Sequence, residues 1–206
     1  MVEFEDSDEY LPTKRLETLV DGIFAIAMTL LVLGLAVPVI TGPLSNTVVE
    51  NSYYGLLPNL FAFILSFLLL AVFWNAHHRI FNKINKINNT LLWINVVWLM
   101  FIVLVPFSAS SLGQYGSYIL PSVIFNINML GIGIFLYLNS FYAIKKNFIK
   151  EETSQIKNRK RSSIIFIIIA AIALILSFTI ASWSTTLYAL LIPLNVAARR
   201  ILFKKI

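Results

Sequence analysis

Six apolar stretches, each about twenty residues long, determine what this chain can fold into. A helix of that length spans the hydrocarbon core of a bilayer, and helices satisfy their own backbone groups there. Hydrophobic residues make up 58% of the chain and charged residues only 13%, so little polar sequence is left for a soluble domain. The sequence therefore predicts an all-α integral membrane protein whose six transmembrane helices form one domain, 14–206. The stretches are 15–37, 53–76, 90–111, 118–144, 162–181 and 183–203.

The basic residues predict how this domain is oriented. All 16 Lys and Arg residues lie at the start of the first stretch, after the second, between the fourth and fifth, and at the end of the chain. By the positive-inside rule both termini are cytosolic, and the short acidic tail, 1–13, has little influence on orientation. The net charge of +6 comes from these juxtamembrane clusters, so we expect membrane lipid rather than nucleic acid as a partner. Pro106 and Pro193 lie inside later stretches and predict helix bends.

The first apolar stretch is unusual because it opens with charged residues. Arg15, Glu17 and Asp21 lie in its first turns. An ionisable side chain at the centre of a spanning helix costs about 2.5 to 3.5 kcal/mol on insertion scales, so such residues usually face protein or water. Asp21 is therefore expected to have a partner within the protein.

A row of branched apolar side chains follows on one face of the same helix. At about 100° per residue, Ile26, Leu30 and Leu33 lie within about 60° of one another. Thr29 borders this stripe, whereas Asp21 points about 140° away from its middle. The stripe either lines a pore or, as on most spanning helices, packs against protein or lipid.

Two motifs resemble those of a known family. The first is Arg15-x-x-x-Leu19-Val20-Asp21-Gly22, and the second is Trp74-Asn75-Ala76-His77-His78-Arg79-x-Phe81. With the predicted topology, they resemble the transmembrane protein 175 family, specifically its single-repeat prokaryotic potassium channels. That family opens its first helix with Arg-x-x-x-Phe-Ser-Asp, so Leu19 and Val20 depart from the pattern.

The resemblance implies a homotetramer in which the first helix of each subunit lines a central pore. In the family, the residues matching Ile26, Leu30 and Leu33 form the constriction, and the residue matching Thr29 influences ion selectivity. A ring of aliphatic side chains closes by dewetting when it is narrow. When wider, it strips part of each ion's water, which disfavours sodium more than potassium. We therefore expect a potassium channel with a modest preference over sodium and no carbonyl filter, although the Thr29 hydroxyl could instead bond to its own helix.

The polar motif residues are expected to hold the first helix in place. Asp21 and Arg15 would tie this helix to its neighbours through the cytosolic end of the second span. The histidines of that span are alternatively interfacial residues beside a tryptophan of the membrane belt, and no metal site is expected because no Cys or carboxylate stands near them. The predicted network comprises Arg15, Asp21, Gly22, Trp74, His77 and His78.

Two other functions stay open from the sequence alone. The many Asn residues in apolar stretches are expected to form hydrogen bonds between helices, but a small secondary transporter would use them as a site at the bilayer midplane. A membrane scaffold without transport would need Arg15 and Asp21 only for structure. No nucleophile and base, and no metal-ligand spacing, points to an enzyme. We expect no cofactor besides permeating K⁺, and a multi-pass location in a prokaryotic plasma membrane.

Overall fold

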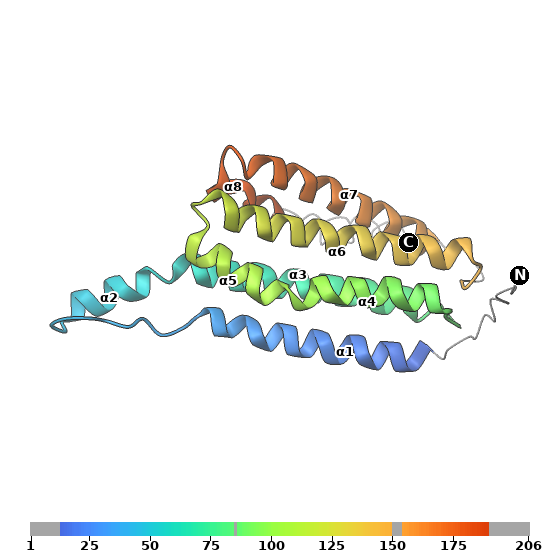
Figure 1. Cartoon of the computed structure of the whole chain (residues 1–206), viewed down its shortest axis with the longest axis horizontal. Helices are drawn as coiled ribbons and strands as arrows, with labels where there is room; N and C mark the ends of the chain where they lie inside the picture. Colours follow the sequence, from blue (N-terminus) through green and yellow to red (C-terminus); the bar gives the residue numbers. More distant parts are fainter. Residues whose placement is uncertain (1–12, 85, 150–153, 190–206) are drawn as a thin grey trace, which may run out of the picture.

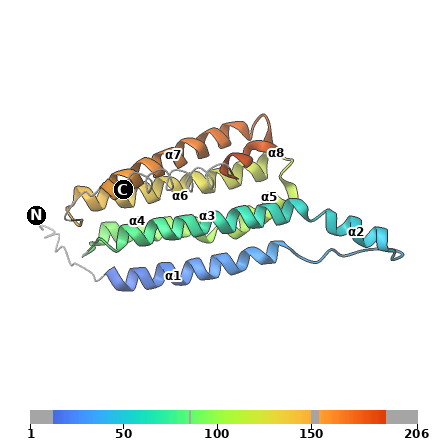
Figure 2. The same cartoon turned by 180° about the vertical axis from the view of Figure 1, so that it is seen from behind.

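The chain folds into a bundle of helices that run along one common direction (Figure 1). The structure is a computed structural model and describes residues 13–84, 86–149 and 154–189. Two edges of the bundle are formed by α1 and α7, and both views show the same order of helices between them (Figure 2). The elements are α1 (Thr13–Leu30), η1 (Leu31–Gly34), α2 (Asn46–Tyr54), α3 (Leu57–Phe81), α4 (Asn89–Val103), α5 (Val105–Tyr115), α6 (Ile119–Lys145), α7 (Ser154–Leu176) and α8 (Ala181–Ser184).

Four helical stretches are long and apolar enough to cross a membrane, which confirms the all-helical membrane fold. A fifth apolar stretch, Arg161–Leu176, is shorter. Most of the predicted span 183–203 and nearly all of the acidic tail 1–13 lie outside the described residues, so the count of six spans stays a prediction. The four long stretches are Thr13–Gly34, Asn46–Phe81, Asn89–Tyr115 and Ile119–Lys145.

The connection between the first two spans differs from the prediction. The first span ends as a short 3₁₀ helix, η1, at Gly34 rather than at residue 37. A separate helix, α2, then precedes α3, and the Ser45 side chain caps it by accepting a hydrogen bond from Val48 N at 3.3 Å. No residue of α2 is buried, and the helix projects beyond the end of the bundle (Figure 1). Sequence patterning missed it because a helix with no buried face has no need of an apolar stripe.

Pro106 divides the third span into two helices. The chain breaks between α4 and α5 at Leu104, and Pro106 occupies the first turn of α5. Proline has no N–H to donate and its ring clashes with the preceding turn, which is why the first turn of a helix tolerates it. The bend predicted at Pro106 is therefore confirmed, while Pro193 lies outside the described residues.

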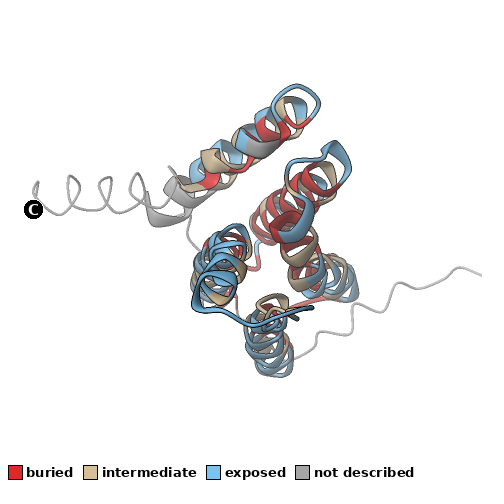
Figure 3. Ribbon diagram, turned by 90° about the vertical axis from the view of Figure 1, so that its left-hand side faces the viewer, coloured by how far each residue is buried: buried red, intermediate tan, exposed pale blue. Residues whose placement is uncertain are grey.

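The packing of α1 separates two faces of this helix. A stripe with helical spacing, formed by Leu16, Val20, Phe24 and Ala27, is buried against α3, α4 and α5. Phe24 anchors it, with its ring centroid 5.5 Å from that of Trp98 on α4. The opposite face is exposed, as the view along the bundle shows (Figure 3). The helix therefore belongs to the core on one side, and on the other no described part of the subunit covers it.

A buried polar cluster joins the opposite edge of the bundle to α6. Asn126 of α6 donates from Nδ2 to Ser177 Oγ at 2.7 Å, and Tyr188 donates its hydroxyl hydrogen to Asn126 Oδ1 at 2.8 Å. All three side chains are fully buried. This is the interhelical role that the sequence predicted for asparagines in apolar helices.

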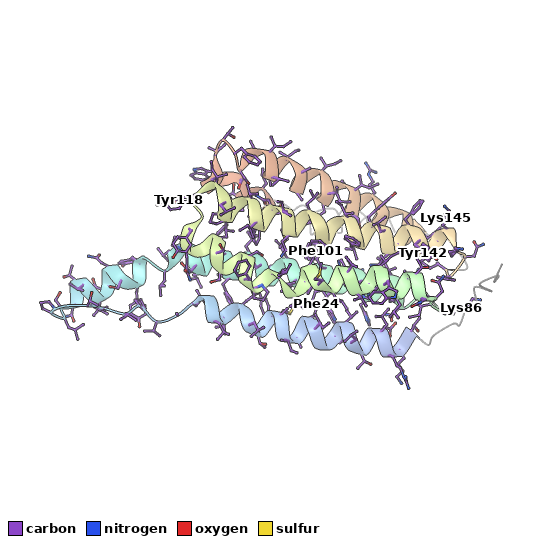
Figure 4. The ribbon with its side chains drawn as sticks, in the orientation of Figure 1. Phe24, Lys86, Phe101, Tyr118, Tyr142 and Lys145 are labelled. Carbon is purple, nitrogen blue, oxygen red and sulfur yellow. The ribbon has the colours of Figure 1, made fainter. Side chains whose placement is uncertain are left out.

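The two ends of the bundle differ in charge. Lys86 and Lys145 lie at the end where α1 begins and α6 finishes, whereas Tyr118 lies at the other end (Figure 4). Lys14 and Arg15 begin α1, and they are exposed at the same end as these lysines. We call this the basic end of the bundle, and the end from which α2 projects the far end.

Candidate functional site

The predicted stripe lies on the face of α1 that is turned away from the other described helices. Ile26 is 60% exposed, Leu30 41% and Leu33 71%, although all three side chains are purely apolar. Thr29 and Gly22 are also exposed, and a Cβ added to Gly22 would meet no atom within 4 Å. Exposed residues of this kind need a second surface, which in a membrane is lipid, a neighbouring subunit or the wall of a pore.

The hydroxyl of Thr29 is engaged with its own helix. Its Oγ1 donates to the carbonyl of Ile26 at 2.8 Å, with the Ala25 carbonyl also within reach at 3.1 Å. This is the back-bonding arrangement common for Thr in helices. The hydroxyl hydrogen is therefore occupied, and only oxygen lone pairs are left to face an ion or water on the exposed side.

Leu33 lies in η1 rather than in α1. Side chains three residues apart are eclipsed along a 3₁₀ helix, whereas an α-helix separates them by about 60°. Leu33 is therefore aligned with Leu30 more closely than the wheel of an uninterrupted α-helix predicts. The stripe keeps a single face up to the far end of the helix.

Asp21 has the partner that its position demands. Its Oδ1 accepts a hydrogen bond from Trp74 Nε1 at 2.8 Å, so α1 is joined to α3 near the basic end. The Trp74 ring in turn stacks on His78, with centroids 5.6 Å apart and planes 15° apart. A small pocket at this contact is lined by Glu17, Val20, Asp21, Trp74, His77 and His78.

His77 continues this contact into the core. Its imidazole is buried and donates from Nε2 to Asn95 Oδ1 at 2.8 Å, because the Nδ2 of Asn95 is used to donate to Asn139 Oδ1 at 2.7 Å. The ring also stacks on Phe81 and Trp98, with centroid distances of 4.0 and 4.7 Å. His77 and His78 thus point in different directions, as neighbours on a helix do, and only His78 is exposed.

The structure brings most of the predicted network together but leaves Arg15 apart. Within the described residues Arg15 is exposed and makes no ion pair with Asp21. Sequence reasoning had not paired His77 with Asn95 or extended the chain to Asn139. The signal was present, since both asparagines lie in otherwise apolar helices where an unpaired amide would be costly.

Comparisons with known proteins agree with this geometry. The family model described as "Endosomal/lysosomal potassium channel TMEM175" matches residues 15–106, which include α1, α3 and α4 with both motifs. A crystal structure of a lysosomal potassium-selective channel TMEM175 homolog from Chamaesiphon minutus superimposes with a TM-score of 0.77. It is 25% identical, and the match covers 90% of this chain and 97% of that one. The chain resembles the TMEM175 family in sequence and in fold.

The relatives that the chain matches carry two kinds of name. A potassium channel of Chamaesiphon minutus is 37% identical over 120 residues, 56% of this chain and 55% of that protein. A zebrafish (Danio rerio) relative named as an endosomal/lysosomal proton channel is 26% identical over 147 residues, 71% of this chain and 28% of that protein. The chain spans about half the length of the curated bacterial relatives that it matches.

In this protein the contact between Asp21 and Trp74 is expected to contribute to stability. Trp74→Phe keeps an aromatic ring beside His78 but removes the indole N–H. Because Asp21 is exposed, we expect a loss of about 1 kcal/mol, the usual net value of a hydrogen bond. Thermal unfolding of the detergent-purified protein, followed by scanning fluorimetry, measures the change.

Trp93→Phe is the matched control for this experiment, because Trp93 on α4 is 61% exposed. Its replacement should leave the unfolding midpoint where it is. Equal midpoints for the Trp74 and Trp93 variants would mean that the bond to Asp21 adds nothing to stability.

Proposed function

We propose that the chain forms a potassium-permeable channel whose constriction is built from Ile26, Leu30 and Leu33. The observation that carries this proposal is the exposure of these three apolar side chains on the face of α1 opposite its buried stripe. Potassium is proposed as the permeating ion because the bacterial relatives are named potassium channels. A helix with one face in the core and one face free is suited to lining a shared axis.

The pore requires several copies of the chain. One subunit supplies one α1 and hence one apolar stripe, so a closed ring needs subunits related by rotation about an axis. We propose a homotetramer, in keeping with the family resemblance. The basic end of the bundle would face the cytosol, by the positive-inside rule, in the plasma membrane of a prokaryote.

The proposed constriction selects through dehydration. Aliphatic side chains offer no oxygen to replace an ion's water, so a narrow ring empties of water and a wider one admits ions that give up part of their hydration shell. Potassium holds its water less strongly than sodium and is favoured. The discrimination between potassium and sodium is modest, because no protein oxygen replaces the water that either ion loses. Thr29, with its hydrogen bonded to the helix, would add at most an acceptor oxygen beside this ring.

The alternatives make different demands on the same protein. Proton conduction is suggested by the names of the animal relatives, a transporter would need a coupled substrate, and a scaffold would move no ions. Asp21 does not favour proton conduction along the stripe, because its carboxylate is turned toward Trp74 of α3.

Ion flux through reconstituted protein tests the proposal. Vesicles loaded with K⁺ are diluted into a medium whose only cation is N-methylglucamine, and a fluorescent pH dye reports proton uptake. Potassium efflux draws protons in only after a protonophore is added, so a signal before that addition reports proton conduction by the protein itself. Parallel vesicles loaded with Na⁺ measure selectivity.

We expect a signal after the protonophore that is larger with K⁺ than with Na⁺ and absent from protein-free vesicles. A full signal before the protonophore would mean that the protein conducts protons as well as K⁺. A signal that needs valinomycin to supply the K⁺ permeability, with no protonophore present, would replace the potassium proposal with proton conduction. No signal from correctly assembled protein in either salt, with or without valinomycin, would leave the scaffold, and flux that needs an added substrate would favour the transporter.

A further inference from the structure

The far end of the pore helix changes its helical geometry. Residues Leu31–Gly34 form a 3₁₀ helix, and the bond from Leu35 N to Val32 O at 2.9 Å closes its last turn. A 3₁₀ helix rises about 2.0 Å per residue instead of 1.5 Å and aligns side chains three residues apart. The Leu33 side chain therefore lies in line with that of Leu30 along the helix axis. The two residues are also about 1.5 Å further apart along this axis than they would be in an α-helix.

A side chain of α3 holds the end of this turn. Helix ends leave carbonyls without partners, and short 3₁₀ segments have poorer hydrogen-bond geometry than α-helices. The Gly34 carbonyl accepts a hydrogen bond from Asn59 Nδ2 at 3.1 Å. Asn59 is half-buried in the first turn of α3, so a residue distant in sequence supplies what the helix end lacks.

Asn59 is itself fixed by the packing of α3 on α5. A Cβ added at Gly113 of α5 would lie 2.8 Å from the Asn59 Cα, so the two backbones are in direct contact there. Gly34 meets α5 as well, since its Cβ position lies 3.4 Å from Ser110 Cβ. The end of η1 is therefore held between α3 and α5. It packs against Ser110 of α5 and accepts a hydrogen bond from Asn59 of α3.

We infer that Asn59 is a positioning residue that keeps Leu33 in line with Leu30, through its hydrogen bond to the Gly34 carbonyl. The inference rests on the proposed function, because it assigns Asn59 a role in ion selection only if α1 lines the pore. Without this bond the turn relaxes toward α-helical geometry. Leu33 then rotates by about 60° relative to Leu30 and leaves the constriction.

Cysteine accessibility tests this role directly, because the chain has no native cysteine. Leu33→Cys and Ile26→Cys are made separately, each with and without Asn59→Leu. The rate at which a cationic methanethiosulfonate reagent reduces potassium flux is measured for each protein. Asn59→Leu should change the rate at Leu33→Cys by about fivefold, the population shift that one net hydrogen bond of average strength produces. The rate at Ile26→Cys, two turns away, should stay the same.

Three further variants guard against a general effect on folding. Asn59→Gln keeps the amide donor and should restore most of the original rate at Leu33→Cys. Gly34→Ala keeps the carbonyl, meets Ser110 at ordinary contact distance, and should behave as the parent. If Asn59→Leu does not fold, Asn59→Ser gives the same test, because its hydroxyl is too short to reach Gly34 from the same backbone position.

The outcomes separate this inference from the proposed function. An unchanged rate at Leu33→Cys in the folded Asn59→Leu or Asn59→Ser protein overturns the positioning role while leaving the pore in place. If the reagent labels both cysteines and flux does not fall in either, the pore assignment fails, and the role inferred for Asn59 fails with it.

Discussion

Replacing Ile26 by asparagine is expected to raise potassium flux about tenfold, as lowering a barrier by about 1.4 kcal/mol would do, and to bring the potassium and sodium fluxes close to each other. The reason is that Ile26 is 60% exposed on α1 and is proposed to form an apolar ring with its symmetry mates. Amide groups wet such a ring and offer oxygens to both ions, so the dehydration penalty that separates them is lost. The vesicle assay with K⁺ and Na⁺ measures both effects.

Ile168→Asn is the matched control, since Ile168 on α7 is 52% exposed, a fraction close to that of Ile26. It lies on the helix at the opposite edge of the bundle (Figure 1). The same change there should leave both fluxes at the parent values. If the two variants have the same fluxes, Ile26 has no special place in the ion path.

Replacing Asn95 by leucine is expected to destabilise the protein by about 1 to 3 kcal/mol, the largest loss we predict for one side chain. Asn95 is fully buried and joins His77 of α3 to Asn139 of α6. Leucine occupies a similar volume but leaves the His77 Nε2–H and the Asn139 carbonyl oxygen without partners. Buried groups stranded in this way are costly, although interhelical bonds in membranes average only about 0.6 kcal/mol because the unfolded helices find other partners.

Asn89→Leu provides the comparison, because Asn89 is the first residue of the same helix and is exposed. The midpoint of thermal unfolding, measured at one heating rate, should fall for Asn95→Leu and stay unchanged for Asn89→Leu. A midpoint for Asn95→Leu equal to that of the parent would show that the link between α3, α4 and α6 is dispensable for stability.

The length of the apolar stretches was sufficient to predict the all-helical membrane fold. The stretch predicted over 118–144 became α6 at Ile119–Lys145, within one residue at each end, because a long uninterrupted apolar helix has few alternatives in a bilayer. Pro106 also predicted the break between α4 and α5, because proline lacks the N–H that a continuous helix needs at that position. Helix α2 could not be predicted in the same way, since none of its residues is buried in the part of the chain that the structure describes.

The sequence predicted which side chains of the candidate site share one face of α1, but it did not predict which residues of other helices they contact. Helical spacing put Ile26, Leu30 and Leu33 on one side of α1, and the structure places them on its exposed side. The cost of a lone carboxylate demanded a partner for Asp21, but only tertiary packing identifies it as Trp74. The 3₁₀ turn at Leu33 and its bond to Asn59 also depend on α3 and α5, which periodicity within α1 does not report.

A structure of the assembled protein in lipid nanodiscs, determined by electron cryomicroscopy, tests the central claim most directly. It measures which helix surrounds the symmetry axis of the oligomer. We expect four α1 helices around that axis, with the Ile26, Leu30 and Leu33 side chains nearest to it. An assembly in which these side chains face lipid, or in which another helix lines the axis, would contradict the account.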